Sequence, residues 1–62
     1  SKADFVSKIS VAQKEAHESS YWLRIIAESG IAPGSRLSDL SEETGQIIRI
    51  LSAILISSKK NI

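Results

Sequence analysis

Apolar and small residues in the first half of the chain recur every three or four positions, the period of an α-helix with one buried face. This stripe consists of Phe5, Ile9, Ala12, Ala16, Ser19, Leu23 and Ile26. Ser1 followed by Asp4 forms a variant of the capping box, and Gly30 is well placed to end the helix. The pattern predicts a helix over residues 2–29.

The second half of the chain repeats the same spacing. Its stripe consists of Leu37, Leu40, Thr44, Ile47, Leu51, Ile54 and Ser58. β-branched residues are abundant from Ile47 to Ile56, so a strand is the competing interpretation, but apolar residues are contiguous there instead of alternating with polar ones. We therefore predict a helix over residues 36–60, with Glu42 and Glu43 in its first turns, where the helix dipole stabilises acidic groups.

Residues 30–35 form the predicted turn between these helices. Pro33 disfavours helix at the residue before it, and Gly34 supplies conformational freedom. Two helices of similar length joined by a short turn pack as antiparallel neighbours. The sequence thus predicts an all-α fold in which residues 1–62 form one antiparallel helical hairpin, as part of an up-and-down four-helix bundle.

The two helices carry more apolar surface than mutual packing can cover. On a helical wheel Val11, Trp22 and Ile25 fall to one side of the first stripe, and large apolar residues of the second helix cover an arc of about 160°. Leaving four or five such residues in water would cost on the order of 10 kcal/mol. We predict that further helices cover this excess. The expected oligomer interface comprises Val11, Trp22, Ile25, Ile48, Leu55 and Ile56.

A chain of 62 residues forms at most one small domain of marginal stability, which usually needs a disulfide, a metal or oligomerisation. The chain has no cysteine, which is compatible with a cytoplasmic location. No apolar run approaches the roughly 18 residues of a membrane span, and we expect no membrane contact. Because the chain begins at a helix start with Ser1 in place of Met, we expect that an N-terminal part has been removed.

Candidate chemistry is sparse. His17 is the single histidine and shares a polar face with Gln13 and Tyr21, so a solvated surface histidine is favoured over a catalytic or metal-binding one. The carboxylates of Glu42 and Glu43 are better explained by the helix dipole than by acid–base catalysis. No serine pair lies near a base, and no glycine-rich phosphate loop is present. We predict a non-enzymatic protein without metal or cofactor.

Basic residues gather at one end of the predicted hairpin. The antiparallel arrangement brings Lys2 and Lys8 to the same end as Lys59 and Lys60. This end could bind phosphates of RNA or DNA, and in an oligomer the basic ends would add together. The alternative is solvated charge, with Lys59 and Lys60 complementing the helix dipole, although Lys2 and Lys8 do not fit that account.

Short segments spread over nearly the whole chain carry a family resemblance. They are Ser1–Phe5, Ile9, Ala12–Ala16, Tyr21–Leu23, Glu28–Gly30, Ile50–Leu51 and Lys59–Lys60. In these segments the chain resembles the bacterial four-helix-bundle family typified by the 23S ribosomal RNA intervening-sequence protein. It is similar also to the accessory proteins of diversity-generating retroelements.

The resemblance covers the C-terminal half of the family pattern, in which an earlier helical pair comes first. It implies a four-helix protomer that forms a ring-shaped homopentamer, with nucleic acid as the suspected partner in some members. Two copies of a truncated chain could instead pair as a four-helix dimer. Two functional hypotheses follow. One is an oligomeric accessory protein that binds nucleic acid through its basic end, and the other is a purely structural module for oligomerisation or protein–protein contact.

Overall fold

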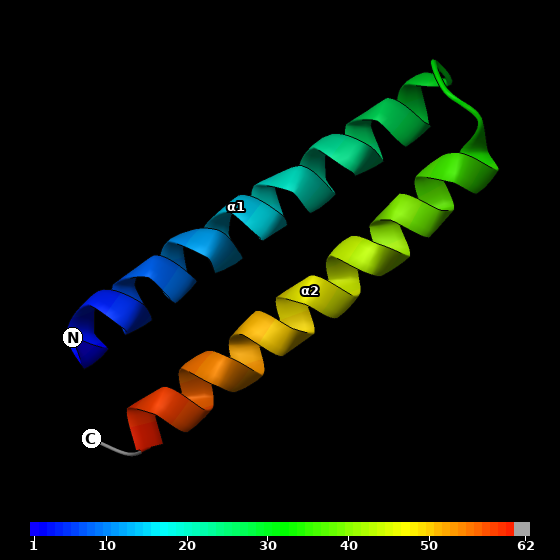
Figure 1. Cartoon of the computed structure of the whole chain (residues 1–62). Helices are drawn as coiled ribbons and strands as arrows, with labels where there is room; N and C mark the ends of the chain where they lie inside the picture. The colour runs from blue at the N-terminus through cyan, green and yellow to red at the C-terminus, as the bar shows by residue number, and fades with distance from the viewer. Residues whose placement is uncertain (61–62) are drawn as a thin grey trace.

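The protein consists of two antiparallel helices joined by a short turn (Figure 1). The computed structural model describes residues 1–60, apart from the side chain of Lys60. Helix α1 spans Lys2–Ser29 and helix α2 spans Gly34–Lys60. The N-terminal end of α1 and the C-terminal end of α2 lie at the same end of the hairpin. The predicted all-α hairpin is confirmed.

Both ends of α1 are capped as the sequence predicts. The backbone N–H of Asp4 donates to the Ser1 hydroxyl oxygen at 3.2 Å. At the other end Gly30 adopts a left-handed conformation with φ of 73°, and its N–H donates to the carbonyl of Ala27 at 3.4 Å. A residue with a Cβ is strained in this conformation, so glycine at position 30 fixes where α1 ends.

The start of α2 differs from the prediction. The helix begins at Gly34, and the N–H of Leu37 donates to the carbonyl of Pro33 at 3.3 Å. Proline is suited to this position because it has no N–H to leave unpaired. Because α2 begins at Gly34, its first turn contains no acidic residue. Glu42 and Glu43 lie too far along the helix for the helix dipole to stabilise their carboxylates, which corrects the prediction from the sequence.

The contact between the helices is narrow. Within residues 1–59, only Leu37 and Leu55 are buried, with 5% and 7% of their surface exposed. Half-buried residues complete it: Val6, Ile9, Ala12, Gln13, Ala16, Ser20, Leu23 and Ile26 of α1, and Thr44, Gly45, Ile48, Leu51, Ser52, Ile54 and Ser58 of α2. One hydrogen bond between side chains crosses it, from the Gln13 amide nitrogen to the Ser52 hydroxyl at 2.6 Å. Gln13 therefore faces α2, whereas the sequence pattern placed it on the outer polar face.

Helix α2 is rotated relative to the predicted stripe. Leu40 and Ile47, expected inside, are exposed, while Ile48 and Leu55, expected on an outer interface, face α1. The row that faces α1 includes small residues such as Gly45 and Ser52. The row through Leu40 and Ile47 is bulkier and points away. In α1, likewise, Phe5 and Ser19 are exposed, and their neighbours Val6 and Ser20 are half-buried instead.

The hairpin is a thin rod. Its dimensions are 45 × 14 × 12 Å and its radius of gyration is 14.3 Å, against about 10.6 Å for a compact domain of this length. Its accessible surface is 4735 Å², against about 3900 Å² for a compact protein of 6.7 kDa. The difference, about 800 Å², is surface that a self-contained domain of this size would have buried.

Candidate interaction surfaces

Large apolar side chains lie mostly on the outside of the hairpin. Within the described residues, ten of them are exposed, seven are half-buried and two are buried. The exposed residues are Phe5, Val11, Tyr21, Trp22, Ile25, Ile31, Leu40, Ile47, Ile50 and Ile56. Single exposed apolar residues are common on soluble proteins, but a set that outnumbers the core marks an interaction surface.

Four of the outward apolar residues of α2 form a continuous row. Leu40, Ile47 and Ile54 are spaced by seven residues, and Ile50 lies between the last two. Ile47 and Ile50 expose 51% and 59% of their surface, and Ile54 is half-buried at the boundary with α1. A seven-residue repeat of this kind is the pattern of a helix that packs against another helix.

Two apolar residues of α1, the exposed Trp22 and the half-buried Ile26, lie on the same side of the hairpin as this row. Successive residues turn about 100° around a helix. Each helix can be viewed along its axis from its own N-terminus. In this view, Trp22 and Ile26 are rotated away from the residues of α1 that face α2. Ile47 and Ile50 are rotated in the same direction away from the residues of α2 that face α1. Because the helices are antiparallel, rotation in the same direction turns both sets of side chains toward one broad face of the hairpin. We call it the apolar face. It consists of Trp22, Ile26, Leu40, Ile47, Ile50 and Ile54.

The opposite broad face is polar. It carries the Gln13–Ser52 hydrogen bond, and the exposed side chains of His17, Arg24 and Arg49 belong to it. The aliphatic groups of α2 therefore point mainly to one broad face, which also carries the exposed charged residues Lys8, Glu15, Arg36 and Glu43, spaced by seven residues from Trp22 or Ile50. A hairpin with its aliphatic groups gathered in this way matches one layer of a helical bundle.

The residues predicted for an oligomer interface are distributed over several surfaces. Val11, Trp22 and Ile25 are exposed on α1, and Ile56 is exposed on the polar side of α2. The predicted interface does not include Leu40, Ile47 and Ile50, which form an exposed row on α2. The seven-residue spacing from Leu40 to Ile54 is the signal that identifies them.

Two aromatic side chains stand next to each other at the surface. The rings of Tyr21 and Trp22 are 5.6 Å apart between centroids, with an edge-to-face angle of 68°. Both side chains are more than half exposed. Such a pair holds a large apolar surface in a fixed orientation, which suits it to packing against another chain.

The basic end contains the exposed residues Lys2, Lys8 and Lys59. The side chain of Lys60 lies outside the described part of the chain. Within the described residues, the one ion pair joins the terminal amine of Ser1 to Asp4 at 3.9 Å, so none of these three lysines is paired with a carboxylate. Their charge is therefore available to an external anion.

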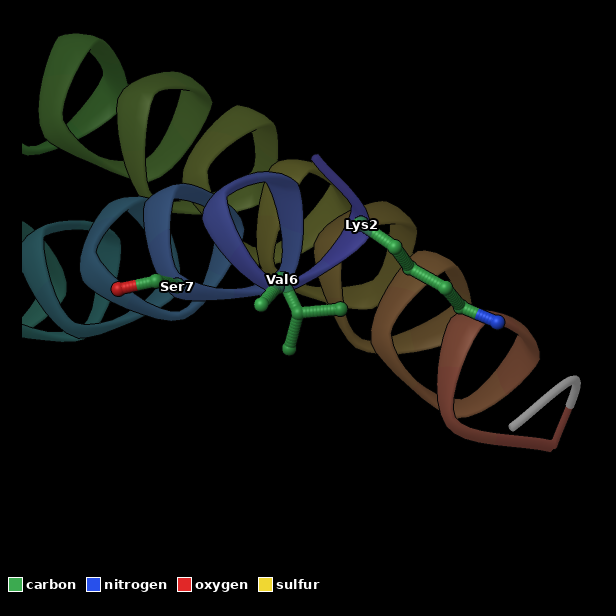
Figure 2. Close-up of a pocket in the computed structure, with 4 residues that line it drawn as sticks. Lys2, Val6 and Ser7 are labelled. Carbon is green, nitrogen blue, oxygen red and sulfur yellow. The ribbon is translucent and has the colours of Figure 1, made fainter.

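A shallow hollow lies beside the basic end. It is lined by Lys2, Ala3, Val6 and Ser7, all from one surface of α1. The labelled side chains of Lys2, Val6 and Ser7 spread apart over this surface and do not converge on an enclosed space (Figure 2). The hollow is too open to hold a small molecule by enclosure, as ligand sites usually do.

The turn end is acidic. Asp39, Glu42 and Glu43 line shallow surface depressions there, together with Arg36, Leu40 and Gln46. No group of three or more potential metal ligands of the His, Cys, Asp and Glu types occurs within the described residues. In the same part of the chain, neither helix is both long and apolar enough to cross a membrane.

Comparisons of this chain with protein-family models, with curated proteins and with solved structures found no match.

Proposed function

We propose that this chain is a non-enzymatic assembly module that supplies two helices to a larger helical bundle in the cytoplasm. The observation that carries this proposal is the excess of exposed over buried large apolar side chains. The continuous row from Leu40 to Ile54 supports a helix, in preference to a flat surface, as the element that covers the apolar face.

Energetics favour the same conclusion. Fully burying an exposed Leu, Ile or Phe side chain contributes about 1.5–3 kcal/mol. Leu40, Ile47 and Ile50 expose 41%, 51% and 59% of their surface, so covering them contributes about 2–5 kcal/mol per chain, or about 5–9 kcal/mol when two chains pair. A whole small domain is stable by about 5–15 kcal/mol. The contribution expected from assembly is therefore as large as the stability of a domain, and folding of the hairpin should be coupled to assembly.

The proposal includes membership of the four-helix-bundle family that the sequence resembles. A bundle of four helices requires two pairs, each apolar on one broad face. The row of outward aliphatic residues on α2 supports that role without specifying how many copies assemble.

The decisive measurement is mass by light scattering together with helicity by circular dichroism, over a dilution series of the purified chain. We expect a mass well above the 6.7 kDa of one chain at high concentration, and a loss of helicity as dilution separates the subunits. A chain that stays monomeric and fully helical at every concentration would contradict the proposal.

A second function, nucleic-acid binding at the basic end, is favoured by the three unpaired lysines. Each phosphate contact that a lysine makes should contribute about 0.9 to the slope of log affinity against log salt concentration for duplex DNA. We expect Lys8→Gln and Lys59→Gln each to lower this slope, and Arg36→Gln, which removes an exposed positive charge at the turn end, to leave it unchanged. Binding that is insensitive to salt, or equally weakened by all three substitutions, would exclude this function.

A further inference from the structure

We infer that a second copy of this chain covers the apolar face, with its long axis antiparallel to the first. The result is a two-fold symmetric four-helix bundle whose symmetry axis passes near Ile47. This inference rests on the proposed assembly function and specifies its partner and orientation.

The uncovered area has the size that a dimer requires. The hairpin exposes about 800 Å² more than a compact protein of its mass. A standard stable interface buries about 800 Å² on each partner. A second copy therefore offers an interface of the size that this surplus requires.

The apolar row is symmetric in a way that suits an antiparallel partner. Leu40 and Ile54 lie seven residues on either side of Ile47. In a two-fold interface the same patch is used on both subunits. Antiparallel pairing then sets Ile47 against Ile47 of the partner subunit and Leu40 against Ile54 of the partner subunit, so that large apolar side chains meet at three levels of the row.

Charge selects the antiparallel orientation over the parallel one. The half of the hairpin with the basic end contains six Lys or Arg and two Asp or Glu, in residues 2–15 and 47–60. The half with the turn, residues 16–46, contains two Lys or Arg and five Asp or Glu. The halves therefore carry charges of +4 and −3. Antiparallel pairing sets each basic half against an acidic half, whereas parallel pairing sets like charges together, which costs free energy.

Cysteine cross-linking tests the orientation directly, because the natural chain has no cysteine. We expect Ile47→Cys to form a disulfide with itself across the symmetry axis. A mixture of Leu40→Cys and Ile54→Cys chains should cross-link at least about tenfold faster than either chain alone, since only the mixed pair lies in contact in the antiparallel bundle. Ile56→Cys, on the polar face, is the matched control and should cross-link slowly.

The outcomes separate this inference from the function on which it rests. If Leu40→Cys chains cross-link among themselves as fast as the mixture does, the pairing is parallel and the inference is wrong, although assembly stands. An unmodified assembly of any size other than two chains also overturns the inference alone. A folded monomer overturns both.

The unmodified chain gives a second measurement that does not depend on any variant folding. Raising the salt concentration from about 0.01 M to about 1 M shortens the Debye length from about 30 Å to about 3 Å and removes attraction between opposite charges. The antiparallel dimer should therefore dissociate more readily at the higher salt, by about tenfold or more in its dissociation constant. Tighter association at high salt would indicate that like charges meet, and would overturn the inference.

Discussion

Replacing Ile50 with glutamate tests the apolar face against a control that the chain itself provides. Ile50 and Ile56 both belong to α2 and both expose 59% of their surface in the isolated hairpin. They differ in direction, because Ile50 lies on the apolar face and Ile56 on the polar side. Within a single hairpin, the two substitutions therefore have similar effects on solvation, helix propensity and net charge.

The expected magnitude follows from burial in the assembly. Covering the 59% of Ile50 that the hairpin exposes contributes about 1–2 kcal/mol, and a glutamate there loses that contribution and adds the cost of removing a charge from water. In an assembly of two chains the substitution occurs twice, so association weakens by at least about 4 kcal/mol, or about a thousandfold in dissociation constant. Ile56→Glu should leave the dissociation constant within about threefold of the original.

Sedimentation equilibrium over a range of concentrations measures both dissociation constants, and circular dichroism at each concentration reports whether the hairpin is still helical. We expect Ile50→Glu to be monomeric, and less helical, at concentrations where Ile56→Glu remains assembled. Equal weakening by the two substitutions would mean that the apolar face has no special role. If neither substitution had an effect, the subunits would have to meet elsewhere.

Three further predictions concern the hairpin itself, each checked by urea or thermal unfolding of the assembled protein. Gly30→Ala should destabilise the hairpin by about 1 kcal/mol, because Gly30 has a φ of 73° that strains a residue with a Cβ. Gly34→Ala should be neutral or stabilise by up to about 1 kcal/mol, because Gly34 has no positive φ and its new Cβ would meet no atom within 4 Å. Equal effects of the two substitutions would contradict the assigned caps. Leu55→Ala should destabilise by about 2–5 kcal/mol, since Leu55 is one of the two buried residues, and a loss below about 1 kcal/mol would show that the two helices do not pack at this position. Gln13→Ala should lower the free energy of unfolding by about 1 kcal/mol in the native chain, but by much less in a chain that already carries Ser52→Ala, because both substitutions remove the same hydrogen bond. If the two losses of stability were additive, that hydrogen bond would be excluded.

The helices could be predicted from sequence because their signals are local. Capping at Ser1, the left-handed Gly30 and the three-and-four spacing of apolar residues depend on neighbours within one or two turns. The sequence places the start of α2 two residues late, because serine is a favoured N-cap and Ser35 and Ser38 follow Pro33, whereas the helix begins on the proline carbonyl.

The rotation of α2 could not be predicted in the same way. Its sequence contains two apolar rows, one through Ile48 and Leu55 and the other through Ile47 and Ile54, displaced by a single residue. Either row could face α1 according to periodicity alone. The choice depends on which row fits the surface of α1, which is a property of two helices together. The same ambiguity explains why Leu55 was expected at an outer interface and is buried.

Antiparallel pairing also changes what the basic end can do. The sequence pattern suggested that basic ends would add together in an oligomer, but in an antiparallel dimer they lie at opposite ends, each beside the acidic turn end of the partner subunit. Nucleic acid would then compete with the partner for Lys8 and Lys59. The disulfide-linked dimer of Ile47→Cys keeps the two chains together at every concentration. We therefore expect that adding Lys8→Gln or Lys59→Gln to this linked dimer leaves the slope of log affinity for duplex DNA against log salt unchanged, because the partner subunit already attracts these lysines. A lower slope after either substitution would show that the lysines are free in the dimer, and that assembly and nucleic-acid binding are independent.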